Sequence, residues 1–121
     1  MLAELQRGRG YAERVLVKAD GRVRFVAVED LDWVEAADNY VRLHARGQQH
    51  LVRETIRSFE ARLDPARFAR IHRSAIINLS RIRELQPTFN GEYTVFLTSG
   101  AKLTLSRTYG DAVRARLGGE R

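Results

Sequence analysis

Hydrophobic and polar residues alternate along most of this chain, a pattern typical of β-strands that bury one face. Two alternating segments lie on either side of Ala19-Asp20-Gly21, whose composition favours a hairpin turn. Strands are expected at residues 15–18, 22–28, 31–36, 40–45, 49–52, 75–77, 81–86, 93–97 and 102–105. The pattern therefore predicts a mainly β fold of about eight to ten short strands in antiparallel sheets.

Two segments change from the period of a strand to that of a helix. Residues 53–63 carry an apolar stripe at helical spacing, with Thr55 as a suitable N-cap and Asp64-Pro65 as the expected end. Residues 106–117 carry a second stripe, and Gly118-Gly119 should stop that helix. The sequence thus predicts one or two short helices beside the sheets.

The domain boundaries follow from where these patterns begin and end. Residues 1–13 show no sustained period and are expected to be a linker, which suggests that another domain precedes it in a longer parent chain. Residues 14–118 form the predicted domain, with 119–121 as a tail. A hydrophobic share of 44% over 121 residues is enough for one core.

Composition narrows the class of protein. The chain has no cysteine, which excludes disulfides and cysteine-based zinc sites, and no run of about 18 apolar residues that would predict a membrane span. The N-terminus is too polar for a signal peptide, so a cytoplasmic setting is expected.

The positive charge of the chain is unevenly placed. Residues 1–64 hold 11 basic and 11 acidic side chains, whereas residues 65–121 hold 10 and 4, so the second half carries the whole net charge of +6. Arg outnumbers Lys 19 to 2, which a high-GC coding bias would explain. That bias does not explain why acidic residues are scarce in the second half of the chain. The uneven distribution of charge favours a polyanionic partner such as nucleic acid.

Evidence for catalysis or for a metal site is weak. His44 and His50 flank a turn and could face each other across a hairpin, but a pair of histidines without a third ligand is a poor metal site. The acids at residues 29–35 resemble a charged strand entry, and the glycines form no phosphate-binding loop. We expect neither an enzyme nor a metal or other cofactor.

Three segments could bind a polyanion. Residues 67–78 concentrate Arg, His, Ser and Asn, with Ala75 to Ile77 as the expected buried strand and Arg70 to Ser74 as the loop that this strand holds in place. Residues 106–109 lead into a helix N-terminus, where free N–H groups favour phosphate. Residues 38–40 form a polar break between strands, where an Asn amide could read a base edge.

Several of these residues also have a purely structural interpretation. Arg107 could pair with Asp111 one helical turn later, and Asn39 could be a left-handed turn residue. His72 could hold the loop through a backbone hydrogen bond, and Asn78 is expected to satisfy backbone groups rather than to contact DNA.

Three blocks of the chain are similar, in order and spacing, to the LytTR family of DNA-binding domains. They are Trp33-Val34-Glu35-Ala36-Ala37-Asp38-Asn39-Tyr40-Val41, Phe68-Ala69-Arg70-Ile71-His72-Arg73-Ser74-Ala75-Ile76-Ile77-Asn78 and Leu103-Thr104-Leu105-Ser106-Arg107. The similarity spans about residues 14–117. It implies an elongated stack of antiparallel sheets whose loops enter successive major grooves and bend the duplex. Family members are mostly the output domains of bacterial two-component response regulators.

The resemblance also implies roles for individual residues. Base reading is expected from Asn39 or Tyr40 in the first loop, from Arg73 in the second and from Arg107 in the third. Phosphate contact or support is expected from Arg70, His72, Ser74, Lys102, Ser106, Thr108 and Tyr109. The expected partners are double-stranded DNA with repeated half-sites, a second copy of the domain on that DNA and a receiver domain in the parent chain.

The alternative is a basic β-domain that binds RNA or single strands. Such a domain needs exposed aromatic side chains on which bases can stack. Aromatic residues make up only 8% of this chain, and most of them, including Trp33 and Phe68, stand at positions typical of a core.

Overall fold

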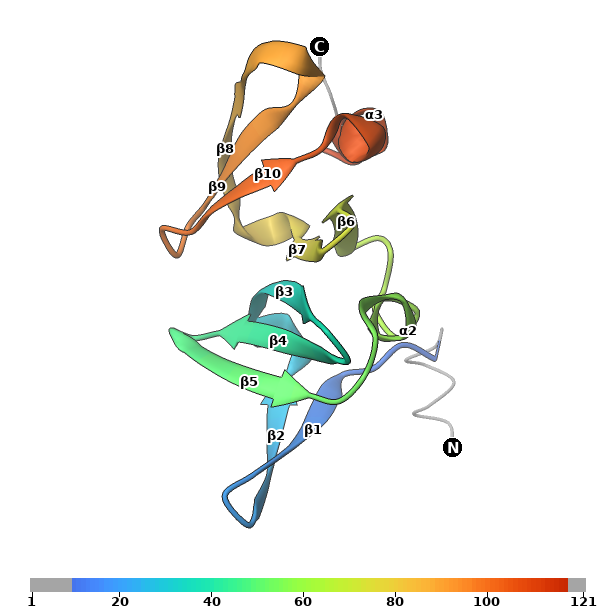
Figure 1. The fold of residues 1–121 in the computed structure, drawn as a ribbon, viewed down its shortest axis with the longest axis vertical. Coiled ribbons are helices and arrows are strands. Elements are labelled where there is room, and N and C mark those ends of the chain that lie inside the picture. Colours follow the sequence, from blue (N-terminus) through green and yellow to red (C-terminus); the bar gives the residue numbers. More distant parts are fainter. Residues whose placement is uncertain (1–9, 118–121) are drawn as a thin grey trace.

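The computed structural model describes residues 10–117 and confirms the predicted fold class. Within this range ten strands form antiparallel sheets of two, five and three strands, accompanied by two short α-helices. The three sheets are stacked along the long axis of the molecule (Figure 1), with the five-stranded sheet in the middle. The elongated stack that the family resemblance implies is therefore present.

The hairpin at the lower end of Figure 1 forms as its sequence predicts. Strands β1 (Arg14–Ala19) and β2 (Arg22–Ala27) pair in register across a two-residue turn. Asp20 and Gly21 in this turn have φ values of 53° and 72°. Positive φ at both central residues is the turn geometry that matches the twist of a two-residue hairpin, which explains the Asp-Gly pair.

The middle sheet has the strand order β5-β4-β3-β7-β6. It consists of a three-stranded meander and a hairpin from distant parts of the chain, which meet where β3 pairs with β7. The strands are β3 (Leu31–Ala37), β4 (Tyr40–Ala45), β5 (Gln48–Val52), β6 (Phe68–His72) and β7 (Ala75–Asn78).

The upper sheet has the order β10-β9-β8 and is followed by the C-terminal helix. The helix lies beside β6, to which Arg116 ties it by donating from Nη1 to the carbonyl oxygen of Phe68 at 3.2 Å. These elements are β8 (Ile82–Pro87), β9 (Tyr93–Leu97), β10 (Lys102–Leu105) and α3 (Arg107–Arg116), and the short 3-10 turns are η1 (Val28–Asp30), η2 (Leu79–Arg81) and η3 (Phe89–Gly91).

Two hydrophobic cores lie on opposite faces of the middle sheet. Ile76 packs into the lower core with the β1–β2 hairpin, whereas its neighbour Ile77 packs into the upper core with the three-stranded sheet and α3. All four residues of β7 are buried. A strand that is covered on both faces has no need for polar residues at alternate positions, which explains the Ala-Ile-Ile-Asn run.

Asn78 ends this strand and is the one buried polar side chain among the core residues of the described chain. Its amide nitrogen donates to the carbonyl oxygen of Leu31 at 2.8 Å, and its amide oxygen accepts from the backbone nitrogen and the hydroxyl of Ser80. The prediction of a structural rather than DNA-binding Asn78 is supported by these bonds, because they use both ends of the amide.

Helix α2 (Ile56–Glu60) is shorter than the predicted segment 53–63. Its start is as predicted, because the side chain of Thr55 accepts from the backbone nitrogen of Ser58 at 3.1 Å. After Glu60 the chain tightens into bonds between residues three apart, such as that from Leu63 N to Glu60 O at 3.1 Å. The helix therefore ends before Asp64-Pro65 is reached.

The structure bears on the N-terminal boundary of the predicted domain but not on its C-terminal boundary. Ala12 donates its backbone nitrogen to the carbonyl oxygen of Arg62 at 2.9 Å, and Glu13 accepts from Val28 at 2.9 Å, so these two residues of the predicted linker are bonded to the domain. The Gly118-Gly119 stop and the tail lie outside the described residues. The domain boundaries stay a prediction.

Candidate nucleic-acid interface

Two of the predicted loops lie side by side because β3 and β7 pair. The pairing sets Glu35 opposite Ala75, so the turn at Asp38-Asn39 after β3 is next to the turn at Arg73-Ser74 before β7. A backbone hydrogen bond of 2.9 Å from Ala36 N to Ser74 O joins the two hairpins near these turns.

The third predicted loop joins this edge through an irregularity in β6. Arg70 pairs with Ile76 and His72 with Ala75, so Ile71 is one extra residue that the ladder leaves out. Such a bulge turns backbone groups away from the partner strand. The free carbonyl oxygen of Ile71 accepts from the backbone nitrogen of Ser106, between β10 and α3, at 2.8 Å. The three candidate segments therefore form one continuous edge of the molecule.

The structure corrects the boundaries of the central loop. The segment from Arg70 to Ser74 is not a loop, because β6 continues through His72 and the connection to β7 consists of Arg73 and Ser74 alone. A two-residue turn on paired strands holds its backbone more tightly than a five-residue loop would.

The four predicted base readers are all exposed at this edge, namely Asn39, Tyr40, Arg73 and Arg107. Tyr40 is 40% exposed, directly after the turn. The left-handed residue of that turn is Asp38, with φ of 57°, so Asn39 is not needed for the turn conformation. Within the described chain, Arg73 has no side-chain partner.

Arg107 is held from a neighbouring turn rather than by its own helix. Its Nη1 donates to the carbonyl oxygen of Asn90 at 3.3 Å, while Asp111 pairs with Arg114 at 3.6 Å instead. Gly91 leaves the space for this arrangement, since a Cβ there would lie 2.8 Å from the Cδ of Arg107. The pairing with Asp111 considered from sequence is therefore absent.

The support residues fall into two groups. Ser74, Ser106 and Thr108 lie at the edge, and Ser106 occupies the N-cap position of α3 without making a side-chain capping bond. Tyr109 is partly buried against the upper core. Lys102 begins β10, at the end away from α3, with its ammonium 5.8 Å from the centre of the Phe96 ring, so it is not grouped with the others.

His72 and Arg70 are directed at the turn backbone. The Nδ1 of His72 lies 2.9 Å from the hydroxyl of Ser74 and accepts from the Ser74 backbone nitrogen at 3.2 Å. The guanidinium of Arg70 donates to the carbonyl oxygens of His72 and Arg73 and to the carboxylate of Glu60. His72 thus holds the turn by a backbone hydrogen bond, which agrees with the structural interpretation of this residue from the sequence.

A polar network lies behind the edge on the upper face of the middle sheet. The ring of His44 stacks on Trp33 with centroids 4.1 Å apart, and its Nε2 lies 3.0 Å from Glu35 Oε1, which also accepts from Arg42 at 3.2 Å. Burial raises the pKa of Glu35, but the hydrogen bonds from His44 and Arg42 outweigh it, so the pKa lies below its ordinary value.

The possible pairing of His44 with His50 is wrong. His44 is opposite Gln49 and His50 is opposite Leu43, so the two rings point to different faces of the sheet. Among residues 10–117 no group of three or more potential ligand side chains could hold a metal ion. No helix in the same range is long and apolar enough to cross a membrane.

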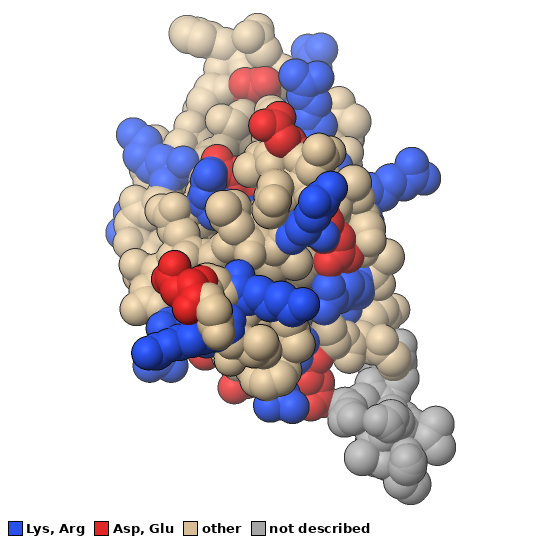
Figure 2. Space-filling view, turned by 60° about the horizontal axis from the view of Figure 1, so that its bottom comes forward, with Lys and Arg blue, Asp and Glu red and all other residues tan. Residues whose placement is uncertain are grey.

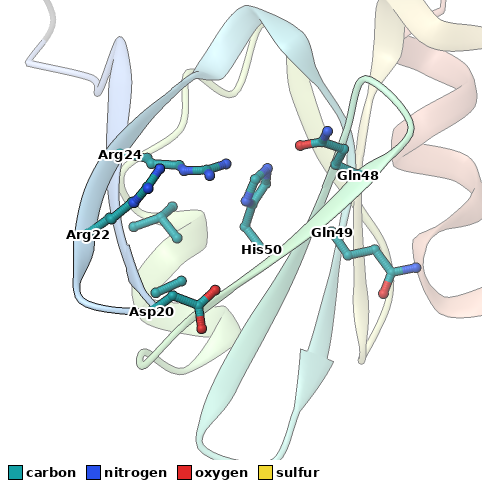
Figure 3. Close-up of a pocket in the computed structure, with 8 residues that line it drawn as sticks. Asp20, Arg22, Arg24, Gln48, Gln49 and His50 are labelled. Atoms are coloured by element: carbon teal, nitrogen blue, oxygen red, sulfur yellow. The ribbon is translucent and has the colours of Figure 1, made fainter.

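At the β1–β2 end of the molecule, positive charge is not concentrated in a single patch. In Figure 2, which brings the β1–β2 end forward, Lys and Arg lie among Asp and Glu. Arg22 and Arg24 extend from β2 toward His50 on β5, around an open hollow (Figure 3). This hollow is near the β4–β5 turn, at the opposite end of β4 from Asn39, and is therefore separate from the candidate edge.

Comparison with known proteins identifies the family of this chain. The family model of the LytTr DNA-binding domain matches residues 21–118. The chain belongs to the LytTR family. LytTR membership makes this a DNA-binding domain of the kind found in LytT and LytR regulators, and it confirms the family resemblance seen in the sequence.

The LytTR relatives are considerably longer proteins. The chain is 32% identical over 107 residues to the sensory transduction protein LytT of Enterococcus faecalis, covering 88% of this chain and 44% of that protein. It is 31% identical to the transcriptional regulatory protein LytR of Staphylococcus aureus, covering 84% and 42%. The chain therefore spans less than half the length of these relatives.

A solved LytTR structure shares the fold. The LytTr DNA-binding domain from Bacillus cereus superposes with a TM-score of 0.81 at 23% identity, covering 89% of this chain and 99% of that one. At this level of identity the match supports the fold alone.

Sequence reasoning missed the residues that hold the LytTR edge from a distance. Glu60 in α2 binds Arg70, and Asn90 with Gly91 positions Arg107. An Asn-Gly pair such as Asn90-Gly91 is typical of a turn, but a sequence does not show that Arg107 lies beside that turn. Glu60 gave no signal, because an exposed helical Glu is an ordinary solubility residue.

Proposed function

We propose that this LytTR domain binds duplex DNA at specific sequences by placing the turns of one edge in successive major grooves. The observation that carries the proposal is the row of three segments with exposed side chains, at residues 38–40, 73–74 and 106–108, joined by backbone hydrogen bonds to the middle sheet. Side chains on such short turns keep a fixed spacing, which base reading requires.

Each segment would supply one base reader. Arg73 and Arg107 can present the guanidinium fork to the O6 and N7 of guanine, and Asn39 can present its amide to adenine, with Tyr40 as the alternative reader beside it. A good bidentate contact contributes about 1–3 kcal/mol of discrimination against the wrong base. Three such contacts account for a specific site.

Phosphate groups would be contacted between the readers. The hydroxyls of Ser74 and Thr108 lie at the edge, and the uncapped N-terminus of α3 after Ser106 directs N–H groups outward. Lys102 is proposed only as a separate contact at the far end of β10. The phosphate contact expected of Arg70 would compete with the bonds that its guanidinium already makes.

The domain would serve as the output part of a bacterial transcription regulator in the cytoplasm. The names of the LytT and LytR relatives support this role, and their extra length leaves room for a receiver domain in the parent chain. Two copies of the domain would bind the two half-sites of one operator.

Binding of RNA or single strands finds less support in the structure. Three aromatic side chains are well exposed, Phe25 at 54%, Tyr40 at 40% and Phe89 at 87%. They belong to β2, β4 and η3, so they form no continuous platform on which successive bases could stack.

The test begins with selection of bound duplexes from a random pool. On the selected duplex, Arg73→Ala and Arg107→Ala should each weaken binding by about 1–3 kcal/mol, because each removes one bidentate base contact. Gel-shift titration against the selected duplex, a scrambled duplex and the single strand gives the affinities.

The control variant is Arg22→Ala, which removes another exposed arginine, at the hollow away from the edge. Its affinity for the selected duplex should stay close to that of the wild type, and thermal melting should show all three variants folded. Unchanged affinity in both edge variants would refute the reader assignment, and a preference for the single strand would refute the duplex proposal.

A further inference from the structure

Arg70 is the most heavily bonded side chain at the edge. Its Nε donates to the carbonyl oxygen of His72 at 3.0 Å, its Nη2 to that of Arg73 at 2.8 Å and its Nη1 to Glu60 Oε1 at 2.6 Å. The side chain is only 16% exposed. One guanidinium therefore connects the last residue of α2 to two consecutive carbonyls of the β6–β7 turn.

The bonds of Arg70 fix the backbone carbonyl groups of His72 and Arg73, which precede Ser74. Ser74 itself is fixed by His72, whose Nδ1 accepts from the Ser74 backbone nitrogen at 3.2 Å. Arg73, which lies between these contacts, is exposed and has no side-chain partner within residues 10–117. The turn thus has a restrained backbone and a free reader side chain.

The geometry leaves Arg70 poorly suited to bind a phosphate directly. Three of the five N–H groups of its guanidinium, one on each nitrogen, already donate a hydrogen bond, and the carboxylate of Glu60 offsets its charge. A phosphate approaching Arg70 would also approach Glu60, whose side chain is 41% exposed. Electrostatic repulsion would oppose that contact.

We propose that Arg70 and Glu60 act as a clamp, with Arg70 as a positioning residue that fixes the backbone of Arg73 before DNA is bound. Pre-organisation of a reader reduces the entropy lost on binding, and it favours the base that fits the fixed geometry. The inference rests on the proposed function, since it takes Arg73 as a base reader. It gives α2, which lies off the edge, a direct connection to sequence discrimination.

Two substitutions separate the clamp from a phosphate contact. Arg70→Lys keeps the positive charge but loses the planar fork that reaches two carbonyls and a carboxylate together. Glu60→Ala removes a negative charge and leaves Nη1 of Arg70 without its carboxylate partner. A phosphate role predicts near-normal binding for Arg70→Lys and tighter binding for Glu60→Ala, whereas the clamp predicts weaker specific binding for both.

The expected result is a loss of about tenfold in the ratio of specific to non-specific affinity for each variant. The salt slope should stay unchanged, because no phosphate contact is lost. Arg62→Lys and Glu54→Ala are matched controls, since Arg62 and Glu54 form a comparable pair at 2.7 Å beside the same helix without touching the turn. They should leave the ratio as in the wild type.

A second measurement does not need DNA. Amide hydrogen exchange at Arg73 and Ser74 in the free domain should accelerate in Arg70→Lys and Glu60→Ala and not in the controls, with thermal melting to show that all variants are folded. Unchanged exchange, or tighter binding by Glu60→Ala, would overturn the clamp. If the wild type prefers no duplex sequence, the proposed function fails, and the exchange data still decide whether the clamp exists.

Discussion

The arginines of the LytTR edge differ in how many of their donors are already bonded. Arg70 donates from all three guanidinium nitrogens, Arg107 makes one long bond to a turn carbonyl, and Arg73 makes none with other side chains in the described chain. An arginine that binds a base must first break the hydrogen bonds that its donors make to water or to the protein. The affinity for the base therefore depends on how strong those bonds are. Of these three arginines, Arg73 is therefore the least restrained and Arg70 has the fewest donors available for DNA.

Glu35 makes the stability of the domain sensitive to acid. Its pKa is lowered in the folded state, so it stabilises the fold at a pH above its ordinary pKa of 4.5, and this contribution is lost as the pH falls through the lower folded value. We expect the free energy of unfolding to decrease on acidification, and Glu35→Gln to decrease it near neutrality while flattening this dependence.

Urea unfolding at a series of pH values from about 3 to 7 measures this effect. Glu84→Gln, at an exposed position of β8, is the control and should follow the wild-type curve. An acid dependence in Glu35→Gln equal to that of the wild type would show that the bonds from His44 and Arg42 do not stabilise the folded state.

The exposure of single residues was predictable where it depends on local chemistry. The proposed base readers come from the turns and from the family resemblance; all four are exposed, and their contact with bases stays a prediction. The bonds of Arg70 could not be predicted, because one of them goes to Glu60, ten residues earlier and on another element. An arginine in a basic stretch has the same appearance in a sequence whether its donors are free or bonded.

At the scale of elements, the turn at Asn90-Gly91 holds the side chain of Arg107, the third proposed reader. Gly91 has φ of 77°, and a Cβ at this position would lie 2.8 Å from Arg107 Cδ and 3.1 Å from its Cγ. Gly91→Ala should therefore cost about 1–2 kcal/mol of stability through its backbone and should also displace Arg107. The displacement should weaken binding to the selected duplex, measured by gel-shift titration.

Gly47→Ala is a close control for that experiment. Gly47 has φ of 75° in the β4–β5 turn, and nothing lies within 4 Å of a Cβ built on it. The two variants should lose similar stability, and only Gly91→Ala should lose affinity for DNA. Equal affinities of the two variants would show that Arg107 does not depend on the β8–β9 turn.

The elements themselves were largely predictable, and the reason is local. Hairpins closed by Asp20-Gly21 or Arg46-Gly47 depend on turn residues that can adopt positive φ, which the sequence displays directly. The extent of α2 and the bulge at Ile71 were not predictable. The bulge is accompanied by a tertiary bond from Ser106 to Ile71, and α2 ends where the backbone changes to bonds between residues three apart; periodicity contains no information on either.

At the scale of the whole molecule, one strand belongs to both hydrophobic cores. Ile76 and Ile77 are both fully buried but on opposite faces of the middle sheet. Ile76→Ala and Ile77→Ala should each cost about 2–5 kcal/mol. Since β7 is common to both cores, we expect each variant to unfold as one unit, with the tryptophan signal of Trp33 and the far-ultraviolet circular dichroism changing together.

Leu51→Ala is the control for these variants, because Leu51 is 49% exposed at the edge of the same sheet and should change stability little. Two separate transitions in either core variant would indicate that the lower and upper halves unfold independently.

The burial of β7 on both faces has a consequence for how such a domain can acquire new DNA targets. A change in β7 must fit two cores at once, so few substitutions there are tolerated. The proposed readers at residues 39, 73 and 107 are exposed, two of them on turns and the third at the first residue of α3, where side chains can be exchanged with little effect on folding. Binding specificity can thus diverge between paralogues, or be redesigned, while the scaffold that spaces the readers remains the same.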